Sequence, residues 1–296
     1  MKKLLFAGLA VAAMAALSIS CQKNELQASD NRHPVSFEAS ISATPGTKFS
    51  MTDKGSYVKA SWEMGDEIAV LWYAGTDDVT SKTYEKFTVT KVSADGKSAT
   101  FTNTSSNFPL SEKVTAMFVY PYRDYDESIK GYVFSAADLS AASSQNPSAN
   151  AVYYAKADVK GGSIPSVTFT QQNSFLFIKK GTVIPGVSEG AHYFDFMGLN
   201  YSGLAKKNTI TQDILSVGSG YVFNTSKKSE EGFKFDSKGS ILQDVWIPFF
   251  PNNKKTTLNI RVYNNMGEKK YDNDTSPWDH SPVVAGKVYD LSNKFK

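Results

Sequence analysis

The chain has 296 residues, of which 41% are hydrophobic and 13% aromatic, and this length suffices for one large or two medium domains with cores of their own. Its formal net charge is only +3, the lysines are scattered, and arginine occurs only at positions 32, 123 and 261. Nucleic-acid binding requires clustered basic residues, so the sequence argues against a nucleic-acid partner.

Residues 1–20 have the pattern of a secretory signal peptide. Lys2 and Lys3 form a short positive region, and an apolar run from Leu4 to Leu17 follows. This run is too short to span a bilayer, and small residues come after it, which favours cleavage. We therefore expect residues 1–20 to be removed on export.

Cys21, the only cysteine of the chain, directly follows this segment. An exported chain with one thiol cannot form an internal disulfide. Residues 18–21 resemble a bacterial lipobox, which implies that Cys21 is the lipid attachment site and carries palmitate-type acyl chains. Each buried methylene contributes about 0.8 kcal/mol, so these chains would hold the protein on a membrane. Residues 21–34 are polar and lack periodicity, which indicates a tether.

Strand signals recur along the rest of the chain. In residues 35–41 apolar and polar residues alternate, with the period of two of a strand that has one buried face. The apolar residues are Val35, Phe37, Ala39 and Ile41. Further apolar or alternating runs cover residues 67–73, 87–92, 97–102, 117–122, 152–155, 167–170, 175–178, 193–197, 221–223, 245–250 and 258–263.

Turn signals separate these runs, for example Asp95-Gly96, which suits the positive φ angles of a tight hairpin. Many short strands at intervals of roughly 8–12 residues favour β-sandwiches over a fold with helices. We predict an all-β fold with two tandem sandwiches, at residues 35–160 and 164–296, because glycines interrupt the strand pattern at residues 160–163.

The histidines give no sign of catalysis. The chain has only His33, His192 and His280, and no serine or carboxylate is spaced from them in a way that suggests a triad. We place His33 in the tether and interpret each histidine as a surface residue. We expect the protein to be no enzyme and to need no cofactor.

Carboxylates cluster at residues 124–127 and again at Asp272, Asp274 and Asp279. The second cluster lacks the glycine turn and the final glutamate of a helical calcium loop. We interpret both clusters as solvated loops and keep a calcium site near Asp272 and Asp279 as the alternative.

The aromatic residues allow a second function, that of a surface glycan-binding lipoprotein in a nutrient-uptake system. This function needs an exposed platform on which sugars stack. The candidates are Trp72, Tyr73, Tyr120, Tyr122, Tyr125 and Trp278. Because most aromatic residues of a sandwich belong to its core, core packing is the simpler interpretation.

Several segments, taken in order, resemble the fimbrillin family, the subunits and subunit-like lipoproteins of type V pili in Gram-negative bacteria. These segments are residues 62–68, Tyr120-Pro121, Gln145, Tyr154-Ala155, Phe169, residues 174–177 and residues 285–291. The resemblance implies Greek-key, transthyretin-like sandwiches and a surface-exposed location at the outer membrane, in a fimbrium. Independently, the turn signal Gly65-Asp66 after Trp62 predicts that this indole packs beneath the following strand.

The resemblance also implies assembly by strand exchange. The first strand, Val35 to Ile41, would be removed by a protease and replaced by a strand from another subunit. The cut would fall in residues 44–56, whose basic residues are Lys48 and Lys54. The implied partners are other pilus subunits, the outer membrane through the lipid, and glycans or proteins on host or bacterial surfaces.

Two features favour a tip, anchor or accessory subunit over a stalk subunit. Stalk subunits of the family are typically cut by an arginine-specific protease, but no arginine lies between Arg32 and Arg123. Only five residues follow Leu291, which leaves little room for an extra donor strand.

Overall fold

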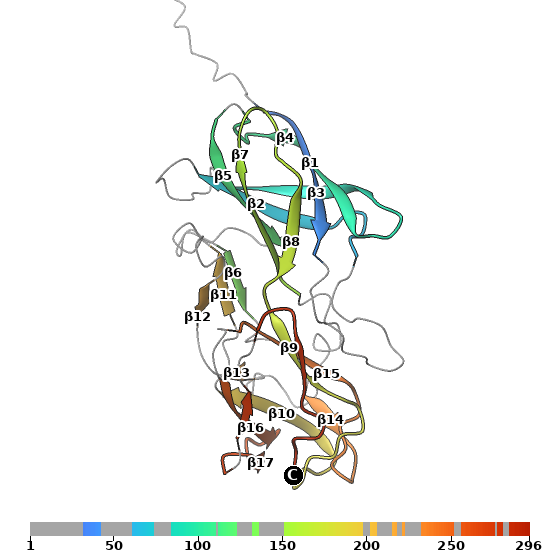
Figure 1. Ribbon diagram of the computed structural model, residues 1–296. Helices are drawn as coiled ribbons and strands as arrows, with labels where there is room; N and C mark the ends of the chain where they lie inside the picture. The colour runs from blue at the N-terminus through green and yellow to red at the C-terminus, as the bar shows by residue number, and fades with distance from the viewer. Residues whose placement is uncertain are drawn as a thin grey trace, which may run out of the picture. The chain divides into compact units, whose positions relative to one another are not determined.

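The computed structural model describes residues 32–42, 61–73, 84–110, 112–122, 132–135, 151–197, 202–205, 215–217, 221–222, 232–251, 256–275, 277–280 and 284–296 (Figure 1). All the regular secondary structure in these segments is β-strand, which confirms the predicted all-β class. They contain no helix that is long and apolar enough to cross a membrane. Residues 32–296 belong to one compact unit.

Seven strands form a closed barrel in the order β1-β4-β3-β2-β5-β7-β8. They are β1 (His33–Ile41), β2 (Glu67–Tyr73), β3 (Tyr84–Val92), β4 (Ser98–Ser106), β5 (Val114–Tyr120), β7 (Tyr153–Val159) and β8 (Val167–Gln171). All neighbouring pairs are antiparallel except β1 and β8, which are parallel. The first and the last strand of the barrel therefore close the sheet on itself.

This closure differs from the open sandwich that strand spacing suggested for the first part of the chain. A sandwich and a small barrel share the same alternation of inward and outward residues. Only the long-range pairing of β1 with β8 distinguishes them. Strand β8 also follows the glycines at residues 161–162, so a barrel strand lies beyond the break in the sequence pattern.

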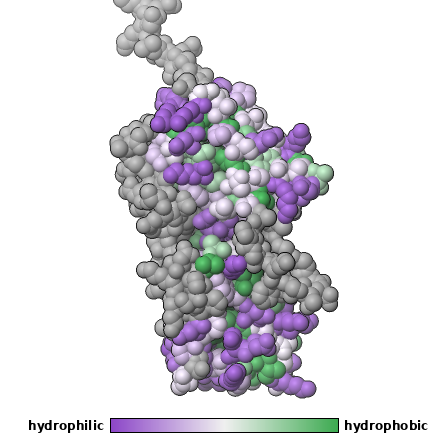
Figure 2. Space-filling view, viewed as in Figure 1, coloured by the Kyte–Doolittle hydropathy of each residue, from purple (hydrophilic) through white to green (hydrophobic). Residues whose placement is uncertain are grey.

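Strands β2 and β5 are buried on both faces. Inside the barrel, Ile68, Val70 and Phe118 belong to a large buried cluster, and from the opposite face Leu71 and Met117 belong to a second one. This double burial explains why these two strands are nearly continuous apolar runs, whereas β1 alternates. On the face that Figure 2 shows, hydrophilic side chains cover much of the described surface, with hydrophobic ones in small patches between them.

The remaining strands form three further sheets. The first has the order β15-β9-β19, with β9 (Ser174–Ile178), β15 (Val245–Phe249) and β19 (Val288–Asp290). The second contains β10 (Gly190–Met197), β13 (Tyr221–Val222), β14 (Phe233–Phe235), β16 (Thr256–Asn264), β17 (Lys269–Asp272) and β18 (Trp278–His280). The third has the order β12-β11-β6, with β6 (Tyr132–Ser135), β11 (Ser202–Ala205) and β12 (Leu215–Val217).

Strand β9 contributes to two buried clusters at once. Phe175 and Phe177, together with Trp246 of β15, belong to the same cluster as the barrel core. The alternate residues Leu176 and Ile178 belong to the cluster of the C-terminal sheets. The rings of Phe177 and Trp246 lie 4.3 Å apart. The barrel and the C-terminal strands therefore share hydrophobic packing through β9 and its neighbours β15 and β19.

Candidate functional site

Strand β1 is held by its two neighbours to different extents. It pairs antiparallel with β4 along nearly its whole length, from His33 opposite Ser106 to Ser40 opposite Ser98. With β8 it pairs only through its last three residues, 39–41. The hydroxyls of Ser40 and Thr168 add a hydrogen bond of 3.2 Å on this side. Most of the backbone pairing of β1 is thus with β4.

The side chains of β1 alternate between core and solvent, as the sequence pattern predicts. Val35, Phe37 and Ala39 are buried, with exposed fractions of 3%, 4% and 1%. Ile41 is half-buried and packs against the same cluster. The intervening Ser36 and Glu38 are exposed. One face of β1 therefore belongs to the barrel core.

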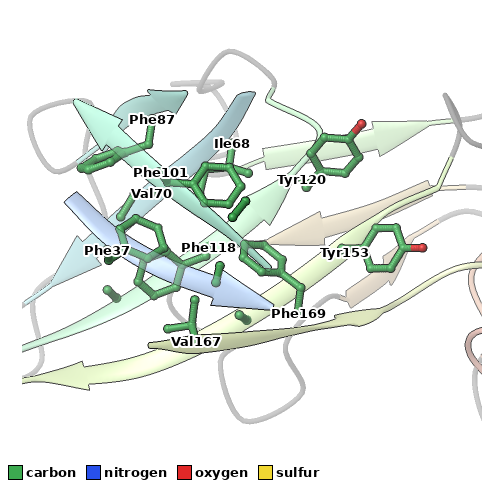
Figure 3. Close-up of a cluster of buried hydrophobic side chains, with 14 of the residues drawn as sticks. Phe37, Ile68, Val70, Phe87, Phe101, Phe118, Tyr120, Tyr153, Val167 and Phe169 are labelled. Carbon is green, nitrogen blue, oxygen red and sulfur yellow. The ribbon is translucent and has the colours of Figure 1, made fainter. Parts of the chain in front are cut away.

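Phe37 lies among aromatic rings from three strands (Figure 3). Its ring centroid is 5.7 Å from that of Phe87 on β3, 5.6 Å from that of Phe101 on β4 and 4.9 Å from that of Phe118 on β5. Aromatic pairs at these separations are favourable beyond their buried area. Phe37 is thus the main anchor of β1 in the core.

Trp62 packs beneath the barrel strands, as the turn signal after it predicts. Its exposed fraction is 2%, and the turn that follows is closed by a 2.8 Å hydrogen bond from the Glu63 amide to Asp66 Oδ2. Gly65 in this turn has a φ of 85°, a conformation that favours glycine. The backbone amide of Trp62 also donates to the carbonyl oxygen of Gly96 at 2.7 Å. The backbone is therefore hydrogen-bonded at Trp62 itself and in the turn that directly follows it.

Glu85, for which the sequence predicts no role, holds the end of β4 and the residue that follows it. Its carboxylate accepts hydrogen bonds from Asn103 Nδ2 at 3.1 Å, from the Asn107 amide at 2.7 Å and from the hydroxyl of Ser106. Ser106 is fully buried and pairs with His33 at the start of β1. A glutamate at a strand start carries no local signal for such a role.

Four of the predicted residues lie outside the described part of the chain. These are Cys21, Lys48, Lys54 and Tyr125. Lipid attachment at Cys21 and cleavage at Lys48 or Lys54 stay predictions, as does the exchange of β1. The acidic residues 124–127 also lie outside the described segments.

The proposed sugar platform does not form from the tryptophans. Trp72 and Trp278 are buried, with exposed fractions of 4% and 9%, and Tyr120 is buried as well. Their rings pack inside the hydrophobic clusters and cannot present a face to a sugar.

Tyr122, another candidate for the sugar platform, is half-buried and packs beside Tyr84 and Lys86. Its ring stacks on that of Tyr84, 6.0 Å away, and Lys86 Nζ lies 5.3 Å from the Tyr122 ring centroid. Tyr73, Tyr84 and Tyr122 all pack against the buried cluster that contains Leu71 and Met117. Tyr84 was missed in the sequence because a tyrosine at the start of a strand looks like any other strand residue.

Two of the three histidines differ from what the sequence predicts. His33 begins β1 and does not lie in the tether. His192 is buried, and its ring meets that of Phe235 edge to face at 5.1 Å. Burial lowers the pKa of His192, and its Nδ1 lies 3.4 Å from the Gly190 carbonyl oxygen. His192 shares the inward face of β10 with Phe194 and Phe196, so its position in the strand buries it although the imidazole is polar.

The second acidic cluster pairs with basic side chains. Asp274 bonds Arg261 at 2.9 Å, and Asp272 forms an ion pair with Lys269 that lowers the pKa of Asp272. Asp279 accepts a 2.6 Å hydrogen bond from the Thr257 hydroxyl. Within the described residues, no group of three or more histidine, cysteine or acidic side chains could hold a metal ion.

No family model matches the chain, and the search of curated proteins gave no match. Among solved structures, the chain is similar to the fimbrial anchor protein Mfa2 from Porphyromonas gingivalis, with 10% identity, a TM-score of 0.42 and 82% of each chain covered. A fimbrial assembly protein from Parabacteroides distasonis has 14% identity and a TM-score of 0.38, with 88% of this chain and 90% of that chain covered. A proposed cell adhesion protein from Bacteroides ovatus has 14% identity and a TM-score of 0.42, with 88% and 93% covered.

Proposed function

We propose that the chain is a fimbrillin-like surface lipoprotein, a structural and adhesive component of type V pili. It acts as a tip, anchor or accessory subunit and joins other pilus subunits by strand complementation. Lipid on Cys21 holds it at the outer membrane, and glycans or proteins on host or bacterial surfaces are its adhesive partners. It performs no catalysis and uses no cofactor.

The placement of β1 carries this proposal. The strand is the first of the barrel, it is bonded to β8 by only three residues, and it fills the core with Val35, Phe37 and Ala39. Its removal would leave the backbone groups of β4 unpaired and an apolar slot open to water. Burying one large apolar side chain contributes about 1.5–3 kcal/mol, so a replacement strand with matching side chains would be strongly favoured.

We also propose two tandem β domains. The barrel forms the first, and strands β9 to β19 form the second, a Greek-key sandwich of the transthyretin type. The pairing of β8 with β1 and β7 favours a division at residues 172–173, between β8 and β9, over one at residues 160–163.

Controlled cleavage tests the proposal. A specific protease site is placed between Lys48 and Lys54 in the full chain, and the cut protein is followed by light scattering with and without a synthetic peptide of residues 33–41. We expect the cut protein to form oligomers or to take up the peptide. Uncut protein is the control, and the cut Glu38→Gln variant should behave like the cut parent because Glu38 is exposed. Cut protein that stays monomeric and binds no peptide would overturn strand complementation.

A further inference from the structure

Ala39 is the smallest inward-facing residue of β1, and two phenylalanines from the flanking strands bracket it. Phe101 of β4 lies opposite Phe37, and Phe169 of β8 lies opposite Ile41. The centroids of Phe101 and Phe169 are 6.3 Å apart although β1 runs between their strands. Neighbouring strands are about 4.8 Å apart, so the two outer strands are about twice that distance from each other. The two rings therefore lean toward each other across β1, on the inward face where Ala39 also lies.

Trp62 packs against both phenylalanines and belongs to the same buried cluster as Ala39. Its indole meets Phe101 edge to face at 5.1 Å and Phe169 at 5.3 Å. It cannot move away easily because its own amide bonds Gly96, where an added Cβ would lie 2.5 Å from Ser61 Cβ. The chain around Trp62 is thus tightly packed, and Ala39, with an exposed fraction of 1%, places only a methyl group into this part of the core.

The neighbouring inward position, that of Phe37, holds a large side chain where position 39 holds a small one. The space that holds Phe37 is bounded by Phe87, Phe101 and Phe118, and an aromatic ring fills it. A strand shifted by two residues in one direction would place Phe37 at the position of Ala39 and Val35 in the Phe37 space, and a shift in the other direction would place Ile41 at the position of Ala39 and Ala39 in the Phe37 space. Both mismatches would act together, so these two positions fix the register of any strand in this place.

We propose that Trp62, Phe101 and Phe169 form a size filter that selects which strand can occupy the β1 position. This inference rests on the proposed exchange of β1. The partner that fits is an extended segment of another polypeptide that runs antiparallel to β4. Its inward residues are aliphatic, aromatic, small and aliphatic in that order, and the small one is alanine, glycine or serine.

The filter itself is tested in the uncut full chain, independently of strand exchange. Ala39→Leu should lower the midpoint of urea unfolding, because the added carbons collide with the three rings. In the Trp62→Phe background the same substitution should lower the midpoint less, because the smaller ring leaves room. An equal shift in both backgrounds would overturn the filter. If Ala39→Leu does not fold, Ala39→Val gives the same comparison, and Ser36→Leu on the exposed face is the matched control.

The second arm uses the chain cut between Lys48 and Lys54 and synthetic peptides of residues 33–41. We expect the peptide with leucine in place of Ala39 to bind at least about tenfold more weakly than the parent peptide, and this difference to shrink in the Trp62→Phe chain. Equal binding of both peptides would overturn the filter. If no peptide binds, strand exchange fails, whereas the unfolding comparison still decides whether the filter exists.

Discussion

The side-chain oxygen of Asn173 accepts a hydrogen bond from the backbone amide of Val152, with 2.9 Å between Oδ1 and N. Asn173 is fully buried between β8 and β9, and Val152 directly precedes β7. The carbonyl oxygen of Asn173 also accepts bonds from Gln171 Nε2 and from the Gly286 amide, each at 3.0 Å. One asparagine thus ties together the start of β7, the β8–β9 connection and the segment before β19.

Replacing Asn173 by alanine should destabilise the whole folded unit. The substitution leaves the buried Val152 amide without its acceptor, which costs about 1–3 kcal/mol of unfolding free energy. Urea denaturation followed by tryptophan fluorescence measures this loss. Gln172→Ala is the matched control, because the side-chain amide of Gln172 donates to exposed groups of Thr170, and the substitution should change stability by less than about 0.5 kcal/mol. Equal effects of the two substitutions would contradict the role of Asn173.

Phe37→Ala tests the anchoring of β1. The ring is buried and contacts three other rings, so its removal leaves a cavity and should cost about 3–5 kcal/mol of unfolding free energy. Glu38→Ala changes the adjacent exposed residue and should be nearly neutral. The measurement is again urea denaturation of the full chain. A loss below about 1 kcal/mol for Phe37→Ala would show that β1 is not anchored by this ring.

His192 should make stability depend on pH. Burial lowers the pKa of His192 in the folded state below its unfolded value, and the positive charge of Lys270 acts in the same direction. The unfolded chain therefore binds a proton more readily, and stability should be complete above about pH 6.5 and fall as the pH drops below it. The difference in unfolding free energy between pH 7.5 and pH 5.5 should be smaller in His192→Phe than in the parent. An unchanged difference would assign the pH dependence to other groups.

Local patterns suffice to predict individual strands of this fold. The alternation in residues 35–41 predicts which side chains of β1 are buried, because a strand with one buried face leaves a period of two in the sequence. Asp95-Gly96 likewise marks the β3–β4 turn, where Gly96 has a φ of 68°. The burial of Trp62 is also predicted locally, because a turn signal next to an apolar run indicates that the indole packs against a strand.

Pairing between distant residues leaves no such local trace. Ala39 pairs with Val167 to close the barrel, and no property of either residue distinguishes this closure from the edge of a sandwich. The roles of the buried Asn173 and of the half-buried Glu85 were missed for a related reason. Their partners, such as the Val152 amide and Ser106, are backbone groups or small hydroxyls far along the chain, and these are invisible until the fold is known.

Lipid on Cys21 would decide where the protein is held. Cys21→Ala should release the protein from the membrane fraction and abolish labelling with a palmitate analogue, because alanine has no thiol to accept an acyl chain. Ser20→Ala is the matched control, since it keeps a small residue before the cysteine and leaves the thiol in place. Cell fractionation with immunoblotting and metabolic labelling provide the readouts. If the Cys21→Ala protein stays in the membrane fraction with unchanged processing, another segment anchors the chain, and the lipoprotein part of the proposal is wrong while strand exchange is still open to its own test.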